Sequence, residues 1–74
     1  MKTYLIVWFS SDGARPSEVR RIIENFGFKP MTGPYDFYYD WGKTKPTIEN
    51  VLLLGDTLQQ ALKKSKVLFK LETV

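Results

Sequence analysis

The N-terminal segment constrains the fold most, because residues 3–9 form an unbroken run of apolar, aromatic and β-branched side chains, Thr3-Tyr4-Leu5-Ile6-Val7-Trp8-Phe9. Such a run is too short to span a membrane and is typical of a strand near the centre of a sheet. A central strand needs a layer of side chains over at least one face, and the rest of the chain has to supply it. Because the sequence contains no cysteine, no disulfide assists, and we expect residues 1–74 to form a single domain around one core.

A helix is predicted over residues 16–26. Apolar residues recur at the i, i+3, i+4, i+7 spacing of a single helix face, at Val19, Ile22, Ile23 and Phe26. Pro16 suits the first helical turn, and Gly27 suits the left-handed position just after a helix end.

The middle and the end of the chain predict three further strands. Residues 28–31 and 35–41 form a hairpin around the turn at 32–34, and Pro30 marks its first strand as an edge strand because proline lacks an N–H group. Residues 67–74 alternate between apolar and polar side chains in their second half, which predicts the last strand.

A second helix is predicted within residues 47–65, with Thr47 as its N-cap. Its apolar positions are Val51, Leu54, Leu58, Ala61 and Leu62. A second interpretation stays open, because Val51–Leu54 followed by Gly55 also suits a short strand, and residues 56–59 resemble a capping box that starts a shorter helix. We favour the continuous helix, in which Gly55 allows close approach to the sheet.

The predicted order is strand, helix, strand, strand, helix, strand. This order resembles the ferredoxin-like fold, an α+β sandwich in which two helices cover one face of a four-stranded antiparallel sheet. The resemblance covers the whole chain but concerns architecture alone, and this fold carries many unrelated functions. It therefore implies no activity.

Strand alternation assigns the side chains to the two faces of the sheet. Those expected toward the helices are Leu5, Val7, Phe9, Tyr35, Phe37, Tyr39, Trp41, Val67, Phe69 and Leu71. Those expected on the opposite face, as a candidate interface, are Tyr4, Ile6, Trp8, Tyr38 and Leu68. The alternation does not settle which side of residues 3–9 is buried, because both sides are apolar. An exposed surface this apolar favours a homodimer through the sheet face.

A second hypothesis concerns the loops that lead into the two helices. In the ferredoxin-like arrangement we expect strands 3–9 and 35–41 to be adjacent and parallel. Both loops then emerge at the same end of the sheet, and the positive ends of both helix dipoles lie side by side. We then expect an edge that binds a small anionic ligand, formed by Ser10, Ser11, Arg15, Lys43, Thr44, Lys45 and Thr47.

The sequence contains no histidine, which together with the missing cysteine removes the commonest metal ligands and acid–base groups. We therefore predict no catalytic residues, no metal site and no cofactor, and a non-enzymatic binding module. Because residues 3–9 are predicted to form a strand and lack the small-residue cleavage site of a secretory signal, we expect a cytoplasmic protein. The net charge of +3 leaves a nucleic-acid-binding domain with a basic helix face, at Arg20 and Arg21, as an alternative. A small enzyme acting on an anionic substrate is a further alternative. Base stacking on the sheet face is not favoured, because Asp36 and Asp40 flank Tyr38 and repel phosphates.

Overall fold

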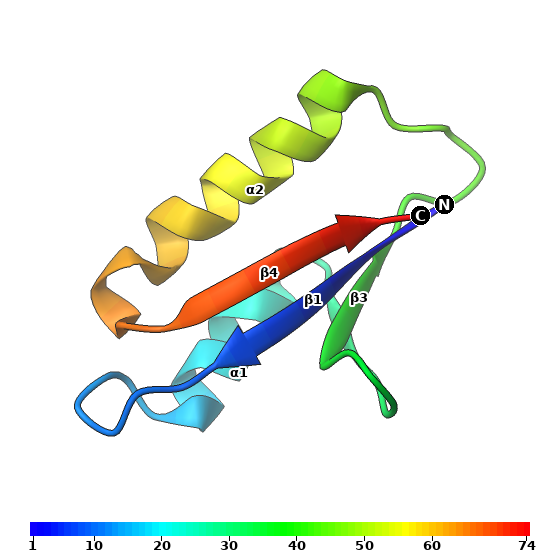
Figure 1. Cartoon of the computed structure of the whole chain (residues 1–74). Coiled ribbons are helices and arrows are strands. Elements are labelled where there is room, and N and C mark those ends of the chain that lie inside the picture. The colour runs from blue at the N-terminus through cyan, green and yellow to red at the C-terminus, as the bar shows by residue number, and fades with distance from the viewer.

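The computed structural model describes residues 1–74 and contains four strands, two α-helices and one short 3₁₀ helix (Figure 1). In chain order the elements are β1 (Lys2–Trp8), α1 (Pro16–Asn25), β2 (Lys29–Pro30), β3 (Phe37–Asp40), α2 (Ile48–Leu62), η1 (Lys63–Ser65) and β4 (Leu68–Thr73). The predicted α+β class and the order of the elements are confirmed. Neither helix is long and apolar enough to cross a bilayer.

The four strands form one open sheet in the order β2-β3-β1-β4, in which every neighbouring pair is antiparallel. The expectation that β1 and β3 run parallel is wrong, because Tyr4 pairs with Tyr38 in an antiparallel register. The reason lies in the connections. The α1 crossover brings β2 back parallel to β1, and the hairpin then reverses the direction of the chain, so β3 runs against both.

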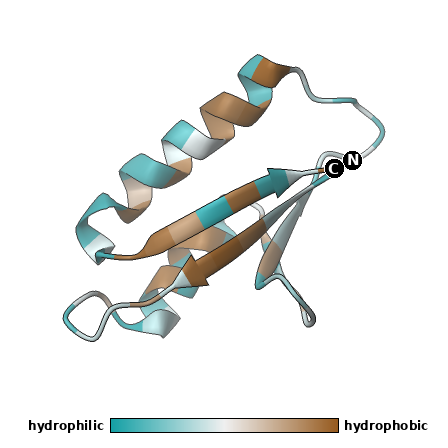
Figure 2. Cartoon of the chain, viewed as in Figure 1, coloured by the Kyte–Doolittle hydropathy of each residue, from teal (hydrophilic) through white to brown (hydrophobic).

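Both helices cover the same face of the sheet and meet the sheet in one core. The buried apolar residues are Leu5, Val7, Val19, Ile23, Phe28, Phe37, Leu58 and Leu62. Burying each of these side chains contributes about 1.5–3 kcal/mol relative to leaving it exposed. Figure 2 shows further apolar residues in the N-terminal half of α2, outside this core.

Helix α1 confirms its predicted pattern. It begins at Pro16 and ends at Asn25, and it buries Val19 and Ile23. Gly27 has a φ of +93°, a left-handed conformation that a side chain would strain, so its role in ending the helix is also confirmed.

Helix α2 is continuous from Ile48 to Leu62, so the alternative of a strand at 51–54 is wrong. Thr47 is the N-cap as predicted. Its hydroxyl accepts from the Asn50 N–H at 3.1 Å, and the Asn50 side chain accepts from the Thr47 N–H at 3.0 Å. A Cβ at Gly55 would lie 3.4 Å from Leu71 Cδ1, which places the helix close to β4.

One residue expected on the helix side of the sheet, Tyr35, lies on the opposite face. Asp36 interrupts the ladder between β1 and β3, because its N–H donates to the Leu5 carbonyl and its carboxylate accepts from the Val7 N–H, each at 2.9 Å. Strand β3 therefore begins after Asp36, and Tyr35 lies on the opposite face. Phe9 follows the end of β1 and is 47% exposed, and it lines a hollow with Pro16 and Arg20 of α1, so it stays on the helix side.

Strand β2 is shorter than predicted, with Lys29–Pro30 instead of residues 28–31. Phe28, just before it, is buried in the core. At the other end of the hairpin, Trp41 follows β3, and its indole N–H donates to the hydroxyl of buried Thr3 at 2.8 Å. This bond explains why Trp41 turns toward the helix side, as predicted.

Candidate functional site

The face of the sheet that the helices leave uncovered is called the outer face here. Burial alternates along β1, since Leu5 and Val7 are 0% and 7% exposed whereas Trp8 is 51% exposed. The alternation settles which side of β1 packs on the helices, and it is the side that we favoured. The strand residues on the outer face are Lys2, Tyr4, Ile6, Trp8, Lys29, Tyr38, Asp40, Leu68, Lys70 and Glu72.

All five residues of the candidate interface lie on this outer face, and the sheet register brings them together. Tyr4 on β1 lies opposite Tyr38 on β3. Trp8 on β1 lies opposite Leu68 on β4, which is 74% exposed. Ile6 lies between these two pairs along β1, so the five side chains form one continuous surface.

Tyr35 covers part of that surface. Its ring stacks on Tyr4, with centroids 4.7 Å apart and ring planes 26° apart. Its hydroxyl donates to the carboxylate of Glu72 on β4, and this bond raises the pKa of Tyr35 because the carboxylate stabilises the protonated phenol. The residue therefore reaches from the hairpin loop across β1 to β4.

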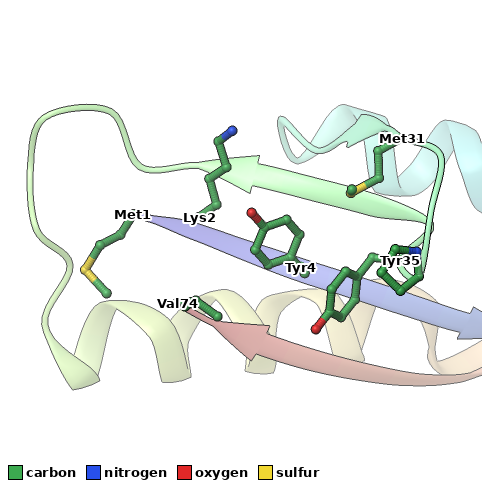
Figure 3. Close-up of a pocket in the computed structure, with 7 residues that line it drawn as sticks. Met1, Lys2, Tyr4, Met31, Tyr35 and Val74 are labelled. Carbon is green, nitrogen blue, oxygen red and sulfur yellow. The ribbon is translucent and has the colours of Figure 1, made fainter.

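Both stacked tyrosines line a shallow hollow of about 610 Å³ at the end of the outer face near both chain termini (Figure 3). Figure 3 shows Tyr4 in the middle, Met31 and Tyr35 on one side, and Met1 and Val74 on the other. Lys2 supplies the one charged side chain of the lining, and its Nζ lies 5.1 Å from the centre of the Tyr38 ring. This arrangement provides aromatic and thioether contact surface with a single cation at its border.

The outer face therefore has two halves. Near the termini, Tyr35 stacks on Tyr4, and Met31 lines the same hollow. At the other end, the open half consists of Ile6, Trp8 and Leu68, of which Trp8 and Leu68 are 51% and 74% exposed and Ile6 is half-buried.

The two loops of the anion hypothesis lie at opposite ends of the sheet. The loop before α1 is near the C-terminal end of α2, since the Ala14 N–H donates to the Ser65 carbonyl at 3.1 Å. The loop before α2 is near the chain termini, since the Trp41 N–H donates to the Met1 carbonyl at 3.0 Å. The shared edge that we expected is therefore wrong, because β1 and β3 are antiparallel and their C-terminal ends point in opposite directions. Anion binding by either loop alone stays a prediction.

Within the first loop, the Ser10 hydroxyl donates to the Asp12 carboxylate, and Lys66 Nζ lies 3.5 Å from the same carboxylate. These contacts lower the pKa of Asp12, with the Ser10 bond as the larger cause. Ser11 and Arg15 are exposed, and Arg15 forms a long ion pair with Glu18 at 3.9 Å.

Within the second loop, the Thr47 hydroxyl is used for helix capping. Lys43, Thr44 and Lys45 are exposed and lie before that cap. On α1, Arg20 pairs with Glu24 at 3.1 Å, which neutralises part of the basic helix face considered for nucleic acid.

Sequence reasoning missed the role of the hairpin loop. The Asp36 carboxylate accepts a hydrogen bond from the Val7 N–H, in the place of a backbone carbonyl. Tyr35 stacks on Tyr4 of the outer face, although strand alternation assigns Tyr35 to the core. The available signal is the aspartate inside a run of aromatic residues, since aspartate is unfavourable in strands and often bonds to nearby backbone. No group of three or more acidic side chains lies close enough to hold a metal ion.

Comparison with models of protein families, with curated proteins and with solved structures finds no match to this chain. Function is therefore inferred from the chain's own residues and contacts.

Proposed function

We propose that this chain is a non-enzymatic interaction module that forms a homodimer through the outer face of its sheet. The observation that carries the proposal is the open half of that face. Trp8 and Leu68 are register neighbours, yet they are 51% and 74% exposed in the single chain. Aromatic residues such as tryptophan and tyrosine are enriched at the buried centres of protein interfaces.

The tyrosine cover supports the same proposal, because it limits the exposed apolar surface to one half of the sheet. A two-fold contact between two open halves places Trp8 and Leu68 of each copy at the centre. The charged residues Lys70 and Glu72 then lie at the border, where solvent reaches them.

The test is the solution mass by light scattering over a concentration series, for the wild type and for Trp8→Glu. A buried carboxylate at the centre of an apolar contact is strongly unfavourable. We expect the wild-type mass to rise with concentration and the Trp8→Glu mass to be half of the wild-type value at high concentration.

The matched control is Leu53→Glu, which introduces the same charge at a residue that is 65% exposed on α2, away from the outer face. This variant is expected to keep the wild-type mass. The proposal fails if Trp8→Glu, folded by circular dichroism, has the same mass as the wild type at every concentration.

We also infer that the fold is ferredoxin-like in detail. Support comes from the strand order, which read from the other edge is β4-β1-β3-β2, and from the two helices that share one face. An experimental structure tests this inference through the handedness of the two crossovers, which are expected to be right-handed.

A cytoplasmic location is part of the same proposal. Cell fractionation with an antibody to the folded chain tests it.

A further inference from the structure

Strand β4 has one unpaired edge. It lies at the border of the sheet, and of the other strands it pairs with β1 alone. Its six residues, Leu68–Thr73, contain no proline and no break in the ladder. An edge strand of this kind exposes a row of N–H and C=O groups that another strand is able to bind.

The hydrogen bonds to β1 show which groups are free. The N–H groups of Lys2 and Val74 donate to each other's carbonyls at 3.1 and 3.0 Å, so these residues form a hydrogen-bonded pair. Because bonding alternates along an antiparallel ladder, the N–H and C=O groups of Phe69, Leu71 and Thr73 point away from β1.

The opposite edge of the sheet differs from this one. Strand β2 contains only Lys29 and Pro30, and proline has no N–H to offer. Such a short edge with a proline resists pairing with other strands. Edge-to-edge pairing therefore concerns β4 and not β2.

Helix α2 places apolar side chains beside the same free edge. Ile48 and Leu52 line a hollow of about 280 Å³ together with Thr73 of β4, and they are 75% and 61% exposed. Burying Leu52 and Ile48 requires a group that approaches along the β4 edge on the helix side of the sheet. Another strand carrying its own helix meets that requirement.

We propose that a second copy of this chain pairs with β4 in an antiparallel manner about a two-fold axis, which joins the two sheets into one continuous sheet. In this arrangement the two α2 helices lie on the same side of the joined sheet and cover each other's Ile48 and Leu52. The contact uses an edge and a helix flank, so it does not rest on the outer-face dimer.

Charge complementarity selects one register for this pairing. With the two-fold axis at Leu71, Lys70 of each copy lies directly opposite Glu72 of the other. An axis at Lys70 or Glu72 sets like charges opposite each other. An axis at Phe69 sets Lys70 opposite Leu68, and an axis at Thr73 sets Glu72 opposite Val74, so neither pairs Lys70 with Glu72. Opposite charges in directly facing positions stabilise an antiparallel pair, and like charges destabilise it. The structure therefore favours the axis at Leu71.

Amide hydrogen exchange measured by NMR tests the backbone pairing. At concentrations where light scattering finds more than one copy, the amides of Phe69, Leu71 and Thr73 are expected to become protected in step with the mass. The amides of Lys70 and Glu72 bond to β1 in every state and serve as internal controls. Unprotected exchange at Phe69, Leu71 and Thr73 in an associated sample overturns the proposal, as does a chain that stays a single copy at every concentration.

Charge exchange tests the register. Lys70→Glu or Glu72→Lys alone sets like charges opposite each other at two symmetric positions, and each is expected to weaken association by about tenfold. The double variant restores opposite charges and is expected to return to within about threefold of the wild type. Lys64→Glu, with the same charge change away from β4, is the control. Single variants that bind as the wild type does, or a double variant as weak as either single one, overturn the register.

Two further measurements separate this contact from the outer-face dimer. Thr73→Pro removes an outward N–H and is expected to abolish edge pairing, whereas Thr73→Val keeps that N–H and is expected to retain the pairing. In Trp8→Glu, the protection of Phe69, Leu71 and Thr73 is expected to persist. Loss of that protection in Trp8→Glu, in a folded chain, overturns independent edge pairing. If both contacts form, the wild type contains four copies and each variant two.

Discussion

The two helices cover the same sheet but bury their apolar residues to different extents. In α1, Val19 and Ile23 are buried and Ile22 is half-buried, so its apolar stripe is used by the chain's own core. In α2, Leu58 and Leu62 are buried, yet Ile48, Leu52 and Leu53 are among the exposed large apolar residues. The N-terminal half of α2 thus carries more apolar surface than this core covers.

The difference shows that apolar residues on a helix can serve either the chain's own core or a contact with another molecule. On α1 the stripe is explained by folding alone. On α2 the inward side is explained by folding, whereas Ile48 and Leu52 lie exposed beside the β4 edge, where a partner copy is proposed to cover them. The helices also differ at their N-termini, since Thr47 caps α2 with its side chain whereas Arg15 makes no such bond to α1.

The largest expected loss of stability comes from truncating one buried residue on each helix, which tests whether both helices contribute to the core. Ile23→Ala on α1 and Leu58→Ala on α2 both truncate residues that are 0% exposed in one core. Each is expected to lower the free energy of unfolding by about 2–5 kcal/mol, because the lost burial is joined by a cavity. Urea denaturation measures both, and a loss under about 1 kcal/mol at either position would show that its stripe is not part of the shared core.

The next largest effects on stability are expected at the N-caps of the two helices. Thr47→Ala removes the side-chain cap of α2 and is expected to lower stability by about 1 kcal/mol. At α1, Arg15→Ser creates a serine three residues before Glu18, the capping-box pattern, and is expected to raise stability by up to about 1 kcal/mol. Thermal unfolding measures the stability of both variants, and Thr47→Ser is the control that keeps the cap. If Thr47→Ala and Arg15→Ser both raise or both lower the stability, then α1 and α2 do not differ in side-chain capping as described.

A smaller gain is expected within α2. A methyl group at Gly55 meets Leu71 Cδ1 at 3.4 Å, an ordinary contact, and alanine is a better helix former than glycine. Gly55→Ala is therefore expected to add about 0.5–1 kcal/mol to the free energy of unfolding. Gly13 is the contrasting site, since a Cβ there would lie 2.4 Å from the Ser65 carbonyl oxygen, and Gly13→Ala is expected to destabilise the chain.

The smallest effect on stability is expected for a residue on the exposed side of α2. Leu52→Gln is expected to change the stability of the single chain by less than about 0.5 kcal/mol, because that side chain is 61% exposed. Its counterpart on α1, Ile22→Gln, replaces a half-buried residue and is expected to be more harmful. Urea denaturation at low concentration compares them, and an equally harmful Leu52→Gln would show that α2 uses its outward side within the single chain.

Much of the fold follows from local sequence. The periodicity of residues 16–26 and the residues that cap both helices gave the helices to within a few residues, and the run at 3–9 gave the central strand. The pairing directions did not follow, because nothing in residues 3–9 or 35–41 specifies whether they run parallel. The loop residues of the anion hypothesis were grouped on that mistaken direction, whereas the five outer-face residues were grouped on alternation within a strand, which is a local property.

The sequence by itself determined that a helix begins at Pro16 and ends before Gly27, that Thr47 starts a second helix, and which side chains share a face within β1 and β4. These are short-range properties, fixed by backbone sterics, capping and the period of apolar residues. Only the tertiary structure decided that the two loops lie at opposite ends, that Asp36 replaces a ladder bond and turns Tyr35 outward, and that β4 keeps a free edge beside Ile48 and Leu52. These features depend on contacts between residues far apart in the chain, and local periodicity carries no information about their direction or order.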